Sequence, residues 1–422
     1  MKRIRTYIAL LLAAVIAAGS AGCSTPAVSA KAADLTKNIS AARVDGKASD
    51  KAFISNAADF SIELFKKSIT DRQNSLISPL SVMLALAMTA NGADGETLAQ
   101  LEALLGGGIP LTELNEYLYS YARSLPSQEK SKLKIANSIW FRGNSDSLQV
   151  KDDFLQRNAD YYNAAAYSSA FDKQTLDDIN NWVRSNTDGM IDKILEEIKE
   201  DDMLFLINAV LFDAEWQNVY FKENVRQGDF TDVDGVKRSA DFMHSAEYGY
   251  LDDGMATGFI KPYANGAYSF AALLPNADIP IQEYIDSLTG EKFLDTLINV
   301  QRSMLVYAST PKFKYDYGIS MIDALKALGV RDAFDADTAD FSNMAKTTYG
   351  NGNLFISEVL HKTYISVDEL GTKAGAVTMV AMSGGSSGLP DHMVVDLDRP
   401  FVYAIIDNST NLPIFIGTLM TV

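Results

Sequence analysis

The sequence predicts one large α+β domain over residues 53–422, preceded by a leader and a polar segment. The first part of this region is rich in apolar residues at helical spacing, whereas the later part consists mostly of short strands and turns. No internal repeat or low-complexity boundary interrupts it, so a single domain is expected in a chain of 422 residues. Hydrophobic residues make up 47% of the chain, which is enough to fill a large core.

Residues 1–22 have the pattern of a secretion signal. Three basic residues form its N-terminal part. The apolar run 7–18 that follows them is shorter than a typical transmembrane helix. Cys23, the only cysteine of the chain, stands where bacterial lipoproteins are lipidated, although Ser20 replaces the usual aliphatic residue of a lipobox. Two outcomes stay open: a lipoprotein of the bacterial cell surface, anchored to the membrane through Cys23, or simple secretion with an incidental cysteine.

Residues 23–52 are rich in Ala, Ser, Lys and Asp and have little aromatic content. This composition is typical of a flexible tether that lifts a domain away from a membrane surface. The whole chain carries a formal charge of −17. Because nucleic-acid-binding proteins present basic patches, this acidity argues against nucleic acid as a partner.

Helical signals dominate the first part of the domain. Apolar residues recur there at helical spacing, and capping residues and glycines flank them. The expected helices lie at residues 53–67, 81–90, from 95 onward, 111–125 and 176–186, with strands at 76–77 and 134–141.

Residues 203–212 form a continuous apolar run bounded by charged residues. This pattern is typical of a strand that is covered on both faces. Asn208 lies inside the run and needs a buried partner, because an unsatisfied amide costs about 1–3 kcal/mol. The remaining elements are short strands and turns from 228 to 310, a helix at 319–328 and two closing apolar strands within 400–419.

The chain is organised around the stretch from Ser357 to Pro390. Residues 357–367 have a strand pattern, small and β-branched residues follow Glu369, and Ser383–Gly388 is almost pure Gly and Ser. Such small residues suit neither a persistent loop nor a core strand, which indicates a segment that is a loop in one state and a strand in another. In a strand, alternate residues would form an uncharged face, with Lys373 on the solvated face. The uncharged face comprises Thr372, Ala374, Ala376, Thr378, Val380 and Met382.

The sequence gives no positive case for catalysis, for a metal or for a cofactor, so an enzyme is not expected. The three histidines, His244, His361 and His392, are not spaced as metal ligands. Hydrolase, zinc-protease, Walker and Rossmann motifs do not occur. The Ser383–Gly388 segment could be taken for the nucleophile loop of a hydrolase, but no base accompanies it, and a flexible loop is the better interpretation.

Several separated motifs resemble the serpin family. The stretch Val359–Thr378 is similar to the hinge of the serpin reactive-centre loop, and Asp398–Phe401 is similar to the signature that follows this loop. The other matching motifs are SPLSV, ALAM and GADGET within 78–97, Asn208-Ala209 followed by Trp216, and ADFSNM at 339–344. The resemblance covers residues 53–422 and implies a serpin fold with three β-sheets, about eight or nine helices and an exposed reactive-centre loop.

The resemblance also implies roles for individual residues. Serpins place a polar cluster under the point at which the main sheet opens, and a Trp-Glu-Lys group guards the point at which the loop inserts. The matching residues are Ser78, Ser81, Asn208 and His361 for the cluster, and Trp216, Glu369 and Lys312 for the guard group. Lys-Gly usually precedes this tryptophan in the family, and the chain has Asp213–Glu215 there instead.

Suicide inhibition of a serine protease is the function that the resemblance implies. The protease would be acylated by the loop, whose freed segment would insert into the main sheet and trap an irreversible, covalent 1:1 complex with a monomeric inhibitor. The residues that match the hinge of this loop are Glu369, Gly371, Thr372, Lys373, Ala374, Gly375, Ala376 and Thr378. The alternative is a non-inhibitory serpin, a binding or substrate-like module that is cleaved without trapping.

The scissile bond has three candidates. Family spacing counted forward from Glu369 indicates Gly385-Ser386. Counting back from the end of the loop indicates Leu389-Pro390, but proline after the bond blocks most serine proteases. Met382-Ser383 has the best side chain for an elastase-like pocket, although its inserted segment would be a little short. Because no Lys or Arg follows Lys373 in the loop, an elastase-like or subtilisin-like target is expected rather than a trypsin-like one.

Overall fold

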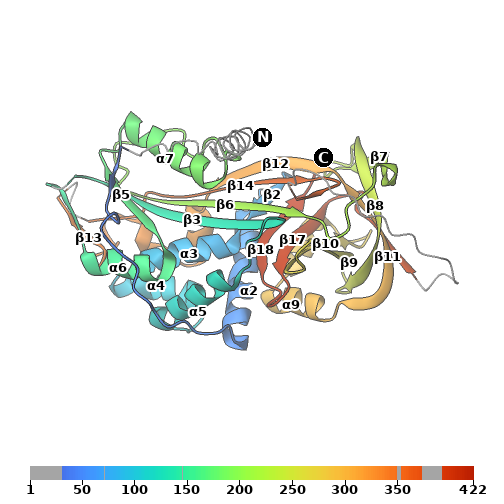
Figure 1. Ribbon diagram of the computed structural model, residues 1–422, viewed down its shortest axis with the longest axis horizontal. Helices are drawn as coiled ribbons and strands as arrows, with labels where there is room; N and C mark the ends of the chain where they lie inside the picture. Colours follow the sequence, from blue (N-terminus) through green and yellow to red (C-terminus); the bar gives the residue numbers. More distant parts are fainter. Residues whose placement is uncertain (1–30, 71, 145, 349–352, 373–391) are drawn as a thin grey trace, which may run out of the picture.

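The computed structural model describes residues 31–422 except 71, 145, 349–352 and 373–391. The described residues form nine α-helices and three β-sheets of seven, nine and two strands (Figure 1). The predicted α+β class, with three sheets and eight or nine helices, is confirmed.

Most helices lie in the first half of the chain, as the helical spacing predicts. They are α2 (Lys51–Ser68), α3 (Pro79–Ala90), α4 (Gly95–Gly106), α5 (Leu111–Ser124), α6 (Asp152–Tyr162), α7 (Lys173–Asn186), α8 (Ile281–Ser287), α9 (Gly290–Ile298) and α10 (Ile322–Ala327). Helix α2 begins after Asp50, whose carboxylate accepts a hydrogen bond from the Phe53 amide at 3.0 Å. Helix α3 begins at Pro79, slightly earlier than predicted, because the fixed φ of proline suits a first helical turn.

The seven-stranded sheet is layered between α7 and α3 (Figure 1). Its order is β1 (Ala33–Asp34), β5 (Ala165–Ser169), β3 (Ser131–Arg142), β6 (Leu204–Glu215), β15 (Gly371–Thr372), β14 (Glu358–Val367) and β12 (Phe313–Ser320). Phe205 and Ile207 of β6 pack in a cluster with Ile179 of α7, whereas Leu206 and Val210 face the main core. Strand β6 is therefore buried on both faces, as its apolar run predicts.

The nine-stranded sheet lies toward the end of the molecule away from α6 (Figure 1). Its order is β16 (His392–Asp396), β11 (Gln301–Pro311), β8 (Lys237–Asp252), β9 (Ala256–Pro262), β10 (Tyr268–Pro275), β17 (Phe401–Asp407), β18 (Pro413–Leu419) and β2 (Ser75–Ile77), with β7 (Val225–Thr231) paired to β8. Strands β4 (Leu148–Val150) and β13 (Ala345–Thr347) form the small sheet. The two closing strands predicted near the C-terminus are β17 and β18.

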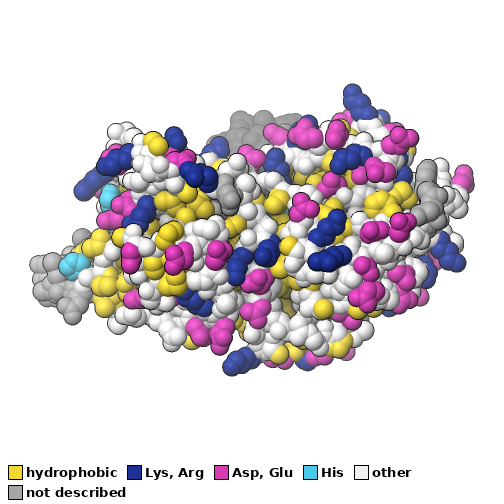
Figure 2. All heavy atoms as spheres, turned by 180° about the vertical axis from the view of Figure 1, so that it is seen from behind, with side chains coloured by type: hydrophobic (Ala, Val, Ile, Leu, Met, Phe, Trp, Pro, Cys, Tyr) yellow, Lys and Arg dark blue, Asp and Glu magenta, His cyan; other side chains and the backbone are white. Residues whose placement is uncertain are grey.

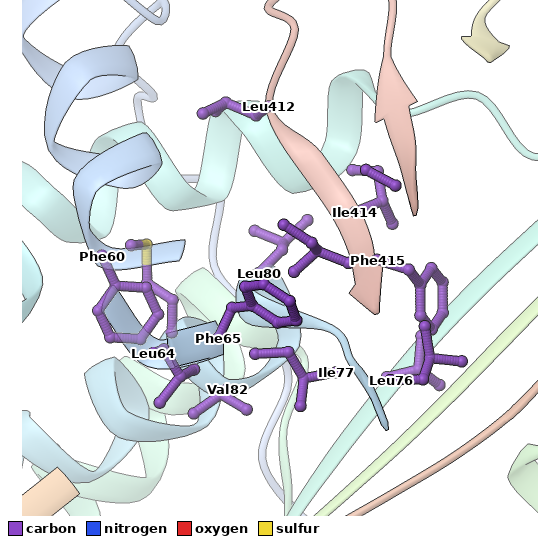
Figure 3. Close-up of a cluster of buried hydrophobic side chains, with 14 of the residues drawn as sticks. Phe60, Leu64, Phe65, Leu76, Ile77, Leu80, Val82, Leu412, Ile414 and Phe415 are labelled. Atoms are coloured by element: carbon purple, nitrogen blue, oxygen red, sulfur yellow. The ribbon is translucent and has the colours of Figure 1, made fainter. Parts of the chain in front are cut away.

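The core is continuous from the helices into this second sheet. Figure 3 shows side chains from α2, β2, α3 and β18 converging, among them Phe65, Ile77, Val82 and Ile414. Each of these four is at most 1% exposed. Because β2 pairs with β18, the N-terminal helices and the last strand of the chain are held in one packed unit.

Residues 31–50 differ from the flexible tether that their composition predicts. Strand β1 pairs with β5, and the Leu35 amide donates to the Ala166 carbonyl at 2.9 Å. The segment continues along the body, where the Ala42 amide donates to Asp160 Oδ1 at 2.7 Å and Lys47 forms an ion pair with Glu113. Backbone hydrogen bonds, which polar composition does not reveal, hold this segment in place.

The helix predicted at 319–328 is wrong at its N-terminal end. Ile319 and Ser320 belong to β12, where they pair with His361 and Leu360 of β14. Helix α10 occupies only Ile322–Ala327, and Gly329 follows it with a φ of 104°. Sheet pairing extends the strand two residues into a sequence that has helical spacing.

Positively and negatively charged side chains are mixed on the face drawn in Figure 2. Among the described residues on that face, Lys and Arg side chains are interspersed with Asp and Glu and form no continuous basic patch. No helix in the described part of the chain is both long and apolar enough to span a membrane.

Replacing Ile414 by alanine should strongly destabilise the protein. Ile414 is fully buried, so Ile414→Ala leaves a cavity, and we expect the free energy of unfolding to fall by about 2–5 kcal/mol. The matched control is Ile298→Ala, at a side chain that is 64% exposed, with an expected change within about 0.5 kcal/mol. Urea unfolding measures both, and similar losses for the two variants would contradict this account of the core.

Candidate functional site

The chain reverses direction at the end of β14 and begins a new strand. In the turn 368–370, the Asp368 carboxylate accepts hydrogen bonds from the amides of Leu370 at 2.9 Å and Gly371 at 3.3 Å. Strand β15 then lies between β6 and β14 and runs antiparallel to both. Farther along, β6 and β14 pair directly in parallel, over 205–209 and 358–362. The sheet is therefore parted at one end and closed at the other.

The two residues of β15 fit this position for different reasons. A Cβ atom on Gly371 would lie 2.0 Å from the Ala214 carbonyl oxygen, so only glycine can approach β6 this closely. Thr372 is 2% exposed, and its hydroxyl lies 2.5 Å from the hydroxyl of Tyr263. Thr372 thus lies on a buried, uncharged face, as the alternation of the hinge predicts.

The Trp-Glu-Lys group predicted from the resemblance meets around this turn. The Trp216 indole donates to the Asp368 carbonyl at 2.9 Å, and its backbone amide donates to the Leu370 carbonyl at 2.8 Å. Lys312 Nζ lies 2.8 Å from Glu369 Oε1. Trp216 thus contacts the turn 368–370 directly and Lys312 contacts it through Glu369, immediately before β15 enters the sheet.

Electrostatics favour the charged form of both members of the ion pair. The hydrogen bond with Glu369 raises the pKa of the Lys312 ammonium. Burial on its own would raise the pKa of the Glu369 carboxyl, but the hydrogen bond and the charge of Lys312 outweigh it and leave that pKa lowered. About a third of each side chain is accessible, so the pair orients the turn more than it stabilises the fold.

A buried polar cluster lies beneath the paired part of β6 and β14. His361 and Asn208 are register partners across these strands, and His361 Nδ1 lies 2.9 Å from Asn208 Oδ1. Ser81 Oγ donates to the same oxygen at 2.7 Å, and the Ser78 amide donates to His361 Nε2 at 3.0 Å. The structure thus brings together all four residues predicted for this cluster.

The hydrogen bonds fix the protonation of His361. Because Nε2 accepts from the Ser78 amide, the ring proton is on Nδ1 and is donated to Asn208. Burial lowers the pKa of the imidazole to about 3, so the ring is neutral near pH 7. The cluster is therefore a neutral hydrogen-bonded network near pH 7.

Several residues at the site were not predicted. Asn137 of β3 is the register partner of Asn208 and accepts a hydrogen bond from its amide at 2.5 Å. Tyr263 stacks on Trp216 with ring centroids 4.6 Å apart. An asparagine inside a predicted strand is the same signal that drew attention to Asn208, so Asn137 could have been found. Tyr263 follows the end of β9, and no pattern in the sequence marks it.

The remaining candidates fall outside the described residues. They are Cys23, the hinge residues Lys373, Ala374, Gly375, Ala376 and Thr378, and the reactive-bond candidates Met382, Ser383, Gly385 and Ser386. Within the described part of the chain, no group of three or more His, Cys, Asp and Glu residues could hold a metal ion.

Comparisons with known proteins match this architecture. The model of the family Serpin (serine protease inhibitor) matches residues 55–422. Serpin-Z2B of Triticum aestivum is 31% identical over 358 residues, which cover 82% of this chain and 89% of that protein. The crystal structure of the thermophilic serpin Tengpin in its native state is 57% identical, with a TM-score of 0.88, covering 93% of this chain and all of that one. The latent state of Tengpin matches with 56% identity and a TM-score of 0.79, covering 89% of this chain and all of that one.

Lowering the pH from 7 to 5 should destabilise the protein through His361. In the unfolded chain the imidazole takes up a proton near pH 6.5, whereas folded His361 stays neutral down to about pH 3. The stability linked to this group is thus present above pH 6.5 and is lost as the pH falls toward 3. We expect a loss of about 2 kcal/mol in the free energy of unfolding between pH 7 and 5, measured by urea unfolding.

This part of the pH dependence should disappear in His361→Gln. The exposed His392 provides the matched control, because His392→Gln should keep the dependence of the parent protein. If His361→Gln retains the same slope as the parent, another group is responsible.

Replacing Gly371 by alanine should expel β15 from the sheet. The new Cβ would overlap the Ala214 carbonyl oxygen, so β15 could no longer pair with β6. We expect faster hydrogen exchange of the backbone amides of Ala214, the register partner of Thr372, and of Trp216, which donates to the Leu370 carbonyl, measured by mass spectrometry. Gly318→Ala is the control, because a Cβ there meets only Lys362 side-chain atoms at 3.5 Å or more. Unchanged exchange in Gly371→Ala would show that glycine is not required.

Proposed function

The chain belongs to the serpin family of serine protease inhibitors, and from this premise we propose that it is an irreversible suicide-substrate inhibitor. The observation that supports this most directly is the position of Gly371 and Thr372 between β6 and β14. Insertion of the hinge has already begun with small, uncharged residues at a defined register. If the hinge could not enter the sheet, Gly371 and Thr372 would not form a strand between β6 and β14.

The register of β15 indicates how insertion would continue. Gly371 pairs with Glu215 and Thr372 with Ala214. Continued at the same register, Thr378 would face Asn208, and Met382 would face Leu204 at the start of β6. Ala374, Ala376 and Thr378 would point to the main core, whereas Lys373 would lie opposite Asp213 on the other face. No charge would be buried in the core, where an unpaired charge costs several kcal/mol.

Trapping would require one covalent step from the protease and one conformational step from the inhibitor. The protease serine oxygen attacks the scissile carbonyl, the peptide C–N bond breaks, and the leaving amine takes a proton as the acyl ester forms. The segment on the Glu369 side, now free at its far end, inserts between β6 and β14. It carries the ester-linked protease with it and distorts the active site before water can hydrolyse the ester.

The loop composition supports an elastase-like or subtilisin-like target. The residues from Ala374 to Asp391 include no Lys or Arg, which a trypsin-like pocket would need. The extended register favours a cleavage at or after Met382, because the inserted strand then spans β6 from end to end. Both Met382-Ser383 and Gly385-Ser386 meet this condition.

We further propose that the inhibitor acts as a monomer outside the cytoplasm, held at the membrane by a lipid on Cys23. The basic head, apolar run and single cysteine of the leader support this. Mass spectrometry of the membrane fraction from cells expressing the full chain, and of a Cys23→Ser variant, tests it. Release of the parent without a lipid would favour secretion.

The test of inhibition is incubation of residues 24–422 with neutrophil-type elastase, subtilisin and trypsin. We expect a complex with elastase or subtilisin that survives denaturing electrophoresis, together with a released C-terminal peptide that begins at Ser383 or Ser386. Cleavage without a complex and with undiminished protease activity would overturn the proposal in favour of a non-inhibitory serpin.

Thr372→Arg should convert the inhibitor into a substrate. Thr372 is 2% exposed, so arginine would place an unpaired charge in the core and slow insertion relative to ester hydrolysis. We expect the yield of covalent complex to fall severalfold while cleavage of the loop continues, both read from denaturing gels. Lys373→Arg is the control, because position 373 is expected on the solvated face. Equal complex yields for Thr372→Arg and the parent would contradict the insertion argument.

A further inference from the structure

A buried ion pair joins β8 and β9, which are neighbours in the nine-stranded sheet (Figure 1). Lys261 Nζ of β9 donates to Glu247 Oε1 of β8 at 2.6 Å, and the two side chains are only 2% and 5% exposed. Charged residues are seldom buried this completely, because their removal from water is costly. An apolar pair of similar size is often at least as stable, so stability alone does not account for these two charges.

The ammonium group of Lys261 also contacts two aromatic rings. Its nitrogen lies 4.3 Å from the centroid of the Tyr220 ring and 5.5 Å from that of the Trp216 ring. A cation at such a distance is attracted by the negative face of a ring, and more strongly where water is excluded. Tyr220 is 6% exposed and Trp216 is 2% exposed, so both contacts are shielded from water.

Tyr220 also binds the residue that forms the ion pair of the turn 368–370. The Tyr220 amide donates to the Glu369 carbonyl at 2.9 Å, while the Glu369 side chain pairs with Lys312. Glu369 is therefore held through its backbone by Tyr220 and through its carboxylate by Lys312, immediately before β15 begins.

The segment 216–220 is tied to β9 at its beginning. The Gln217 amide donates to the Pro262 carbonyl at 3.0 Å. In the described part of the chain, no hydrogen bond joins Tyr220 to β9. The contact with the Lys261 ammonium is thus the polar link between Tyr220 and this strand.

We propose that Lys261 is a positioning residue, which holds the Tyr220 ring and, through the Tyr220 amide, the carbonyl of Glu369. Glu247 supplies the opposite charge that the buried ammonium requires. The consequence for inhibition rests on the proposed function. If the turn is held less firmly, the hinge enters the sheet more slowly, and more of the acyl ester is hydrolysed before the protease is trapped.

The double variant Lys261→Met, Glu247→Leu tests this role in residues 24–422. It removes both charges and leaves apolar side chains of similar size, so the midpoint of urea unfolding should stay close to that of the parent. Hydrogen exchange of the Tyr220 amide, measured by mass spectrometry, should become about tenfold faster, because a water-shielded cation–π contact is lost. The amides of β17 report global unfolding and should keep the exchange rates of the parent.

Two further variants serve as comparisons. The matched control is Lys237→Met, Asp229→Leu, at an ion pair whose side chains are 70% and 59% exposed, and it should leave Tyr220 exchange unchanged. Glu247→Gln keeps the ammonium and an acceptor oxygen, so Tyr220 should stay protected relative to β17.

Equal Tyr220 exchange in the parent and in the double variant would overturn the proposal. Equally accelerated exchange of Tyr220 and β17 would also overturn it, because the pair would then be merely structural. Loss of Tyr220 protection in Glu247→Gln, relative to β17, would overturn the assignment to Lys261.

Trapping is read separately, as the yield of covalent protease complex on denaturing gels. We expect a severalfold lower yield for the double variant than for the parent, and an unchanged yield would overturn the link to inhibition. If the parent traps no protease at all, the proposed function fails, while hydrogen exchange still decides the role of Lys261.

Discussion

A strand inside a β-sheet can pair with only two neighbours, and this constraint governs β6 and β14. They pair with each other in parallel over 205–209 and 358–362, and each pairs with β15 at the other end. Any longer insertion must break the direct pairing. In the proposed mechanism the exchange would be favourable, because one set of parallel hydrogen bonds would be replaced by two antiparallel sets, which are also somewhat stronger per residue. In the described state β6 and β14 still pair directly over 205–209 and 358–362, so this longer insertion has not taken place there.

The polar cluster lies in the section where β6 and β14 pair directly and would have to separate. His361 and Asn208 are partners within the directly paired section, and Ser78 and Ser81 tie them to the start of α3. The network is buried and neutral, so separating the strands breaks hydrogen bonds without exposing a buried charge. At the other end of these strands, the turn 368–370 precedes β15 and is held by contacts of Trp216 and by the Lys312–Glu369 ion pair. The two groups thus lie at the closed and the open end of the same pair of strands.

Patterns in the sequence predicted the parts of this arrangement that depend on local chemistry. The apolar run of β6, the small hinge residues and the isolated Asn208 each indicated a physical requirement, and the resemblance supplied the partners of that asparagine. Contacts formed by backbone or across distant segments were not predictable. Residues 31–50 are polar in composition yet are held by backbone hydrogen bonds, and Ile319 has helical spacing yet pairs with His361 in a strand. Tyr263 reaches Thr372 only because β9 ends beside Trp216, which no local pattern encodes.

The proposed trapping of a protease requires β6 and β14 to separate. A disulfide across these strands tests it directly, with Ile207→Cys and Leu360→Cys at register partners and Cys23→Ser to remove the native thiol. Covalent complex formation with elastase or subtilisin is measured for the oxidised and the reduced variant. We expect the oxidised protein to be cleaved without forming a complex, and we expect reduction with dithiothreitol to restore trapping. Equal complex yields from the oxidised and reduced forms would contradict it.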